Sequence, residues 1–127
     1  MLTIEEVHEI LETLSSELPP TFFAQLNGGV NLIPKAVLSP YAQDNDLYVM
    51  GTYYNDRSMG RYINIYYGSF AAIYGDAPKY RWVSALRKTL RHEFTHHLES
   101  LAGVRDLEDK DARKLRGYTE RRVRKTD

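Results

Sequence analysis

The chain has 127 residues, of which 43% are hydrophobic and 27% are charged, as in an ordinary globular domain. This length suffices for one hydrophobic core and leaves no room for a second, so we expect a single domain over residues 1–127. The formal net charge of zero argues against a general nucleic-acid binder. Because the chain has no cysteine, disulfides, thiolate metal sites and cysteine nucleophiles are excluded.

The amino-terminal segment gives no sign of export. Residues 1–10 have neither the basic start nor the apolar run of a signal peptide. No stretch of the chain approaches the length of an apolar membrane span. We therefore expect a cytoplasmic protein without a membrane partner.

Residues 3–18 have the pattern of an amphipathic helix. Thr3 is an N-cap candidate, and Glu6 stands three residues later, which is the spacing of a capping box. The apolar positions that recur at helical steps are Ile4, Val7, Ile10, Leu11, Leu14 and Leu18. Two adjacent prolines end this helix, and residues 22–26 are expected to form a short second helix before a glycine pair.

The middle of the chain has strand patterns. Residues 30–38 are expected to be extended and to lie at a sheet edge, because Pro34 cannot donate a ladder hydrogen bond. Residues 47–54 and 61–67 are rich in Tyr, Val and Ile, and turn residues join them, so we expect an antiparallel hairpin. Residues 69–74 are expected to form a helical turn. The chain as a whole predicts an α/β fold of the α+β kind, with a small, mostly antiparallel sheet packed on helices.

A long helix over residues 82–102, starting near Asp76 or Pro78, is predicted next, with Gly103 at its C-cap. The stripe expected to face the core recurs at steps of three and four residues: Val83, Leu86, Leu90, Phe94, His97 and Leu101. Another face carries Ala85, Thr89, His92, His96 and Glu99.

This helix contains the His-Glu-x-x-His motif, as His92, Glu93 and His96. Residues four apart on a helix have Cβ atoms about 5–6 Å apart on one face. Both histidines can therefore direct ring nitrogens at one Zn²⁺, at roughly 2.0–2.1 Å each. Glu93 lies off that face, where a carboxylate can act as general base on an attacking water. The plainer alternative is a surface helix that happens to carry histidines.

Two neighbours of the motif are interpreted differently. His97 points away from the pair and onto the apolar stripe, so we expect a hydrogen-bonded core histidine and not a ligand. Glu99 shares the face of the pair but lies about one turn, 5.4 Å, beyond the metal position. We expect Glu99 to support a ligand or to face solvent.

A catalytic zinc usually has three protein ligands and one open position. The chain offers no cysteine, and His8 is placed in the first helix, so a carboxylate is the natural third ligand. The segment after Gly103 offers four, each of which taken alone is a typical surface charge: Asp106, Glu108, Asp109 and Asp111.

At this point the chain resembles a known family. The run from His92 to His97, the later Gly103-x-x-Asp106 and the tyrosine-rich hairpin before them are similar to the small bacterial zincin-like metallopeptidases, or minimal zincins. Their pattern is approximately HExxHHxGxxD, and the resemblance spans residues 18–115. It implies a single-domain zincin-like fold, a Zn²⁺ site with His92 and His96 as ligands, and Glu93 as the base.

The glycine of the pattern stands one helical turn later in this chain than in the family. An extra turn carries the chain about 5–6 Å further from the metal, and about two more extended residues are needed to return. Literal counting from Gly103 gives Asp106 as the third ligand, whereas correction for the extra turn gives Glu108. We favour Glu108, with Asp106 next.

Three functions follow from these features. The first is a zinc-dependent metallopeptidase acting on a peptide or protein substrate, with Glu93 as base; Mn²⁺ or another divalent ion could replace zinc. The second is a non-catalytic metal-binding or protein-interaction module. The third uses the basic tail, residues 113–127, on RNA or an acidic partner. A solvated helical end or a frayed terminus is the more typical interpretation of such a tail, which could also fold back onto the acidic first helix.

Overall fold

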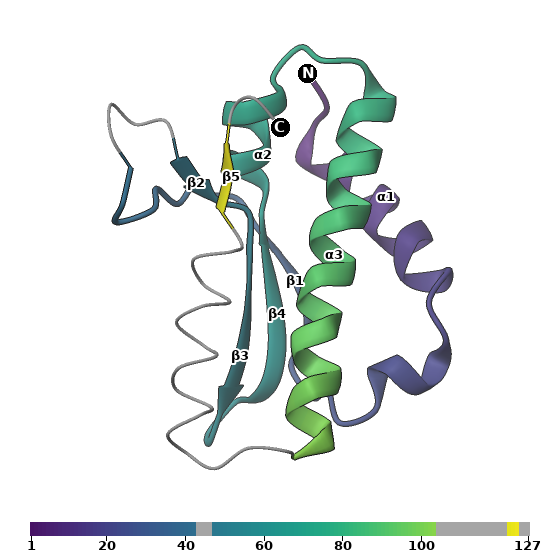
Figure 1. Ribbon diagram of the computed structural model, residues 1–127. Coiled ribbons are helices and arrows are strands. Elements are labelled where there is room, and N and C mark those ends of the chain that lie inside the picture. Colours follow the sequence, from purple (N-terminus) through teal and green to yellow (C-terminus); the bar gives the residue numbers. More distant parts are fainter. Residues whose placement is uncertain (43–46, 104–121, 125–127) are drawn as a thin grey trace.

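The computed structural model describes residues 1–42, 47–103 and the backbone of 122–124. In this part of the chain three α-helices and a small mixed sheet form an α+β fold (Figure 1). The helices are α1 (Ile4–Ser16), α2 (Tyr67–Tyr74) and α3 (Lys79–Ala102), and a 3-10 helix, η1 (Pro20–Phe23), follows α1. None of these helices is both long and apolar enough to cross a bilayer.

The main sheet has three strands in the order β1-β4-β3, from β1 (Gly29–Ile33), β3 (Gly51–Asp56) and β4 (Gly60–Tyr66). β3 and β4 form the expected antiparallel hairpin. β1 is an edge strand, as expected, but it ends at Ile33, whereas the extended segment was predicted to run over residues 30–38. The sheet is mixed because β1 joins β4 in parallel, with Val30 opposite Ile63.

A second, two-stranded sheet pairs β2 (Leu47–Val49) with β5 (Arg122–Arg124) in antiparallel fashion. The run predicted as one strand over residues 47–54 is therefore split at Met50, which is fully buried. The strand β5 also corrects the interpretation of the basic tail as a helical or frayed end, because residues 122–124 pair with β2. The other residues of the tail lie outside the described part.

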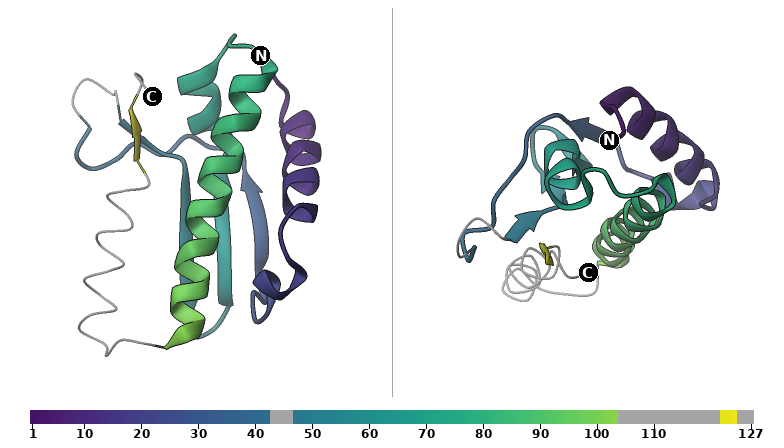
Figure 2. Two further views of the ribbon diagram at one scale, coloured as in Figure 1. Left: turned by 45° about the vertical axis from the view of Figure 1, so that its right-hand side comes forward. Right: turned by 90° about the horizontal axis from the view of Figure 1, so that it is seen from above.

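The core lies between the sheet and the two longer helices. α1 and α3 occupy the same side of the sheet, and α2 continues from the end of β4 (Figure 2). The capping box at Thr3 and Glu6 is present as predicted. The fully buried large side chains come from every layer, among them Val7, Ile63, Ile65, Phe70, Trp82, Leu86 and Phe94.

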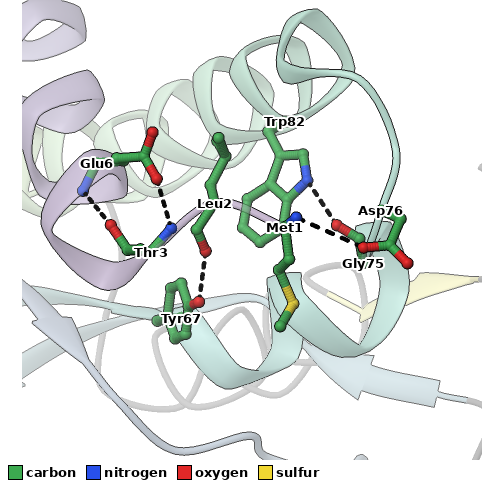
Figure 3. A network of polar contacts seen from close by, with 8 residues as sticks. All are labelled: Met1, Leu2, Thr3, Glu6, Tyr67, Gly75, Asp76 and Trp82. Carbon is green, nitrogen blue, oxygen red and sulfur yellow. Dashed lines mark hydrogen bonds and ion pairs between the residues drawn. The ribbon is translucent and has the colours of Figure 1, made fainter.

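Hydrogen bonds hold the amino-terminal end of α3. The indole Nε1 of Trp82 donates to the carbonyl of Gly75 at 3.3 Å, just before the helix (Figure 3). The hydroxyl of Tyr67 in α2 donates to the carbonyl of Leu2, which leads into α1 (Figure 3). All three helices are thereby connected at this end, and the helix that carries the motif is anchored to the rest of the fold.

The carboxyl-terminal end of α3 is attached to the hairpin. Arg61 of β4 donates from Nε to the Ser100 hydroxyl at 3.2 Å and from a terminal nitrogen to the Gln25 side-chain carbonyl at 3.2 Å. Gly103 follows with φ of 61°, a left-handed conformation, and caps the helix as predicted. The motif therefore sits in the second half of a helix that is fixed at both ends.

Candidate functional site

The two motif histidines point their ring nitrogens at each other. His92 Nε2 and His96 Nε2 are 3.2 Å apart, and both side chains are half-buried. Two nitrogens at 2.0–2.1 Å from one tetrahedral ion lie about 3.3–3.4 Å apart. The pair therefore fits a single shared metal ion with little movement. The same separation also fits a hydrogen bond between the rings when one Nε2 carries a proton.

Glu99 lies behind His96. Its carboxylate Oε1 is 3.4 Å from His96 Nδ1, and its side chain is half-exposed. A carboxylate at Nδ1 favours the tautomer with its proton on that nitrogen, which leaves the Nε2 lone pair directed toward His92. The structure thus agrees with the interpretation of Glu99 as a support for a ligand.

Glu93 is fully buried, on the side of α3 that faces the sheet. Successive helical residues are about 100° apart, so Glu93 leaves α3 beside the face of the histidine pair and one turn after Thr89, which lies near Gly51 of β3. Burial of a carboxylate costs free energy that packing alone does not return. A glutamate kept in the core beside two paired histidines is therefore a candidate for chemistry.

The helix approaches the sheet closely just before the motif. A Cβ atom added to Gly51 of β3 would lie 3.0 Å from Thr89 Cγ2, one turn before Glu93. A glycine at this position therefore lets β3 run close beside the motif helix. β3 pairs with β4 on one side, and no described strand pairs with its other side. On that side its backbone groups are paired with no strand of the described part, and at Gly51 the strand lies close to α3.

His97 is a core histidine, as predicted. It has no exposed surface, its Nδ1 is 2.8 Å from the Tyr53 hydroxyl, and its Nε2 is 2.8 Å from the Ala24 carbonyl. The pKa of His97 lies below its usual value, mainly because the ring is buried. The charge of Arg61 also lowers this pKa, and the hydrogen bond with the Ala24 carbonyl opposes the shift. With Nε2 donating to Ala24, the neutral ring accepts the Tyr53 proton at Nδ1, so both nitrogens are used away from the pair.

The four carboxylates considered as third ligand all lie outside the described residues. These are Glu108, Asp106, Asp109 and Asp111. Within the described ranges no group of three or more His, Cys, Asp or Glu side chains is placed to hold a metal ion. The choice of third ligand stays a prediction.

A groove that the motif did not reveal lies next to the pair of His92 and His96 along α3. It has a volume of about 510 Å³ and is lined by the first half of α3 and by Tyr74 at the end of α2. Arg81 and Lys88 contribute positive charges, and Thr89 lies at its inner side. The signal in the sequence was the spacing of 81, 88 and 92 at steps of seven and four, which places these residues along one side of a helix.

Comparison with known proteins places the chain in a family. No protein-family model matches it, and no curated protein matches it. A solved structure does match, that of a conserved hypothetical protein from Thermus thermophilus, with 34% identity over 80% of this chain and 98% of that chain and a TM-score of 0.66. The chain belongs to the family of this Thermus protein. Membership establishes the fold and brings no activity with it.

The assignment to the minimal zincins is therefore wrong. No family model matches, the structural relative is a conserved hypothetical protein, and the described residues hold no group of three metal ligands. The motif fixes only three positions of a helix, and such short patterns also occur outside the families that they typify. The late position of Gly103 already departed from the family pattern. What His92, Glu93 and His96 do must be argued from their own geometry.

Proposed function

We propose that the chain is a metal-dependent hydrolase of peptide bonds, with His92 and His96 as metal ligands and Glu93 as general base. The observation that supports this proposal most is the 3.2 Å separation of the Nε2 atoms of His92 and His96, with the Glu99 carboxylate next to Nδ1 of His96. Zinc is the preferred ion, and the third ligand would be Glu108 or Asp106, in the segment after Gly103. The finer fold prediction, a motif helix that forms an active site together with an edge strand of the sheet, remains part of this proposal.

The residues would divide the reaction between them. A bound zinc ion would supply Lewis acidity and lower the pKa of a water molecule toward 7. Glu93 would accept a proton from the attacking water as its oxygen adds to the peptide carbonyl carbon. Glu93 would then return that proton to the amine nitrogen as the carbon–nitrogen bond breaks. The free edge of β3 could align an extended peptide by adding a strand.

The metal content of the purified protein tests this proposal. We expect about one zinc per chain in the wild type and in Glu93→Gln, and none in His96→Ala, because a single remaining imidazole and one carboxylate hold zinc weakly. Elemental analysis measures the zinc content per chain. The matched control is His8→Ala on α1, which removes an exposed histidine outside the proposed site. Absence of metal, with no uptake when zinc is added, would leave the pair as a hydrogen bond and overturn the proposal.

Glu99→Gln is expected to weaken zinc binding about tenfold, because the carboxylate that orients His96 would be replaced by a neutral amide. A competition titration against a zinc-binding dye measures the dissociation constant. Glu5→Gln serves as the control, since it makes the same change at an exposed position on α1. Equal affinity in Glu99→Gln and the wild type would mean that the contact with His96 has no role in orienting a ligand.

A metal site without catalysis is the second candidate. The observation that favours it is the surplus of carboxylates after Gly103, which could supply a fourth protein ligand and close the site. Zinc content alone does not separate the two functions. Hydrolysis of peptides by the zinc-loaded protein does, because a closed site has no position for water.

A further inference from the structure

We infer that the groove beside the histidine pair binds the acidic side chains of an extended peptide substrate. This inference rests on the proposed function and adds a substrate class to it. The groove has a volume of about 510 Å³ and lies between Tyr74 and the first half of α3. Arg81 and Lys88 line it, and the lining residues that the structure describes include no acid.

The groove leads to the proposed reaction centre. Lys88 precedes His92 by four residues, so the two side chains are neighbours on the surface of α3. Arg81 lies seven residues before Lys88, on the same side of the helix. Thr89, which lines the groove, also lies near Gly51 of β3, a strand with no described partner on one of its edges. A chain that lies in the groove can therefore reach the histidine pair without leaving α3.

The two cations are available for an external partner. Both are exposed, and neither forms an ion pair with any residue in the described ranges. Arg87 on another side of α3 differs, since its guanidinium is 3.5 Å from the Glu17 carboxylate. Within the described residues, an acid therefore compensates the positive charge of Arg87, whereas none compensates the charges of the two groove cations.

The spacing of the cations suits an extended ligand with separated charges. At 1.5 Å per helical residue, Arg81 and Lys88 are about 10 Å apart along the axis, so each can meet a different side chain of one peptide. An extended peptide advances about 3.3 Å per residue. Lys88 would then meet a side chain about two residues from the reacting bond and Arg81 one about five residues away. Tyr74 and Tyr80 add aromatic surface along that path.

Peptide binding without turnover tests this inference. The probes are fluorescein-labelled peptides of about ten residues with Glu at every third position, or with Gln at those positions, and the protein carries Glu93→Gln so that nothing is cleaved. Fluorescence anisotropy at low ionic strength is expected to give about tenfold tighter binding of the Glu peptide, the sum of two exposed ion pairs. The preference should fall as salt is added.

Variants locate the effect. Arg81→Gln with Lys88→Gln should remove the preference for the Glu peptide. Arg91→Gln with Lys35→Gln removes the same two charges at other exposed positions and should preserve it. Equal binding of both peptides, or a preference that survives the double substitution, would overturn the inference. Tighter binding of a labelled single-stranded oligonucleotide than of the Glu peptide would overturn it as well, in favour of nucleic acid.

The outcome is independent of the metal experiment. A preference for Glu that depends on Arg81 and Lys88 in a protein without zinc would keep the groove as a peptide site and remove the hydrolase. A zinc-loaded, active enzyme that binds both peptides equally would support the hydrolase and overturn the groove as a site for acidic peptides.

Discussion

Replacement of Glu93 by glutamine is expected to abolish peptide hydrolysis while zinc stays bound. The amide has the size of the carboxylate but cannot accept the proton of the attacking water. Loss of a general base typically lowers the rate a hundred- to ten-thousandfold. Because glutamine has the shape of the fully buried glutamate and Glu93 is not one of the proposed ligands, the metal ligands are expected to keep their positions. The measurement is kcat on fluorogenic peptides with zinc content determined on the same samples.

Two control variants test whether the loss of activity has a cause other than removal of the base, such as unfolding. Glu93→Asp keeps a carboxylate but withdraws it by one methylene, so a low but measurable rate is expected, which a merely unfolded protein would not give. Glu5→Gln makes the same chemical change at an exposed position and should keep full activity. Full activity of Glu93→Gln would contradict the role of this residue as base. A loss of zinc from folded Glu93→Gln would make Glu93 a ligand.

The parts of the fold that follow from local rules were predictable. The capping box at Thr3 and Glu6 and the left-handed Gly103 fix helix ends through interactions within a few residues of the chain. The hairpin of β3 and β4 follows in the same way from turn residues between two strand-forming runs. Such signals are contained in short windows, so one sequence suffices to find them.

The parallel pairing of β1 with β4 could not be found in this way. Pairing of strands that are distant in sequence depends on which faces become buried together, here Val30 beside the buried Ile63. The break between β2 and β3 has a similar origin, because Met50 is buried where the chain passes from one sheet to the other. These features arise from packing between distant elements, and the hydrophobic periodicity of a single segment carries no information about that packing.

The candidate site was predictable in part. The spacing of His92 and His96 alone placed both rings on one side of a helix, and the structure brings their Nε2 atoms to 3.2 Å. The full burial of Glu93 was not predicted, because the core stripe was drawn through hydrophobic residues and His97 only. The groove at Arg81 and Lys88 was missed for another reason, since its far wall comes from α2.

His97→Ala is expected to lower the free energy of unfolding by about 3–5 kcal/mol and to leave zinc binding in place. The substitution opens a cavity in the core and removes the ring that joins the Tyr53 hydroxyl to the Ala24 carbonyl, each at 2.8 Å. The Tyr53 hydroxyl and the Ala24 carbonyl would each lose a hydrogen bond, which adds to the cost of the cavity. Urea unfolding with zinc analysis of the folded protein measures both effects.

Tyr53→Phe separates the hydrogen bond from the packing at His97. It removes one hydroxyl and keeps both rings, so a loss of about 1–2 kcal/mol is expected, clearly smaller than for His97→Ala. His8→Ala, at an exposed site on α1, should change stability by less than about 0.5 kcal/mol. A His97→Ala protein that is as stable as the wild type but binds no zinc would contradict the assignment of His96 as the ligand and His97 as the core histidine. His97 would then be a ligand, which requires that one of its two ring nitrogens give up its contact with Ala24 or Tyr53.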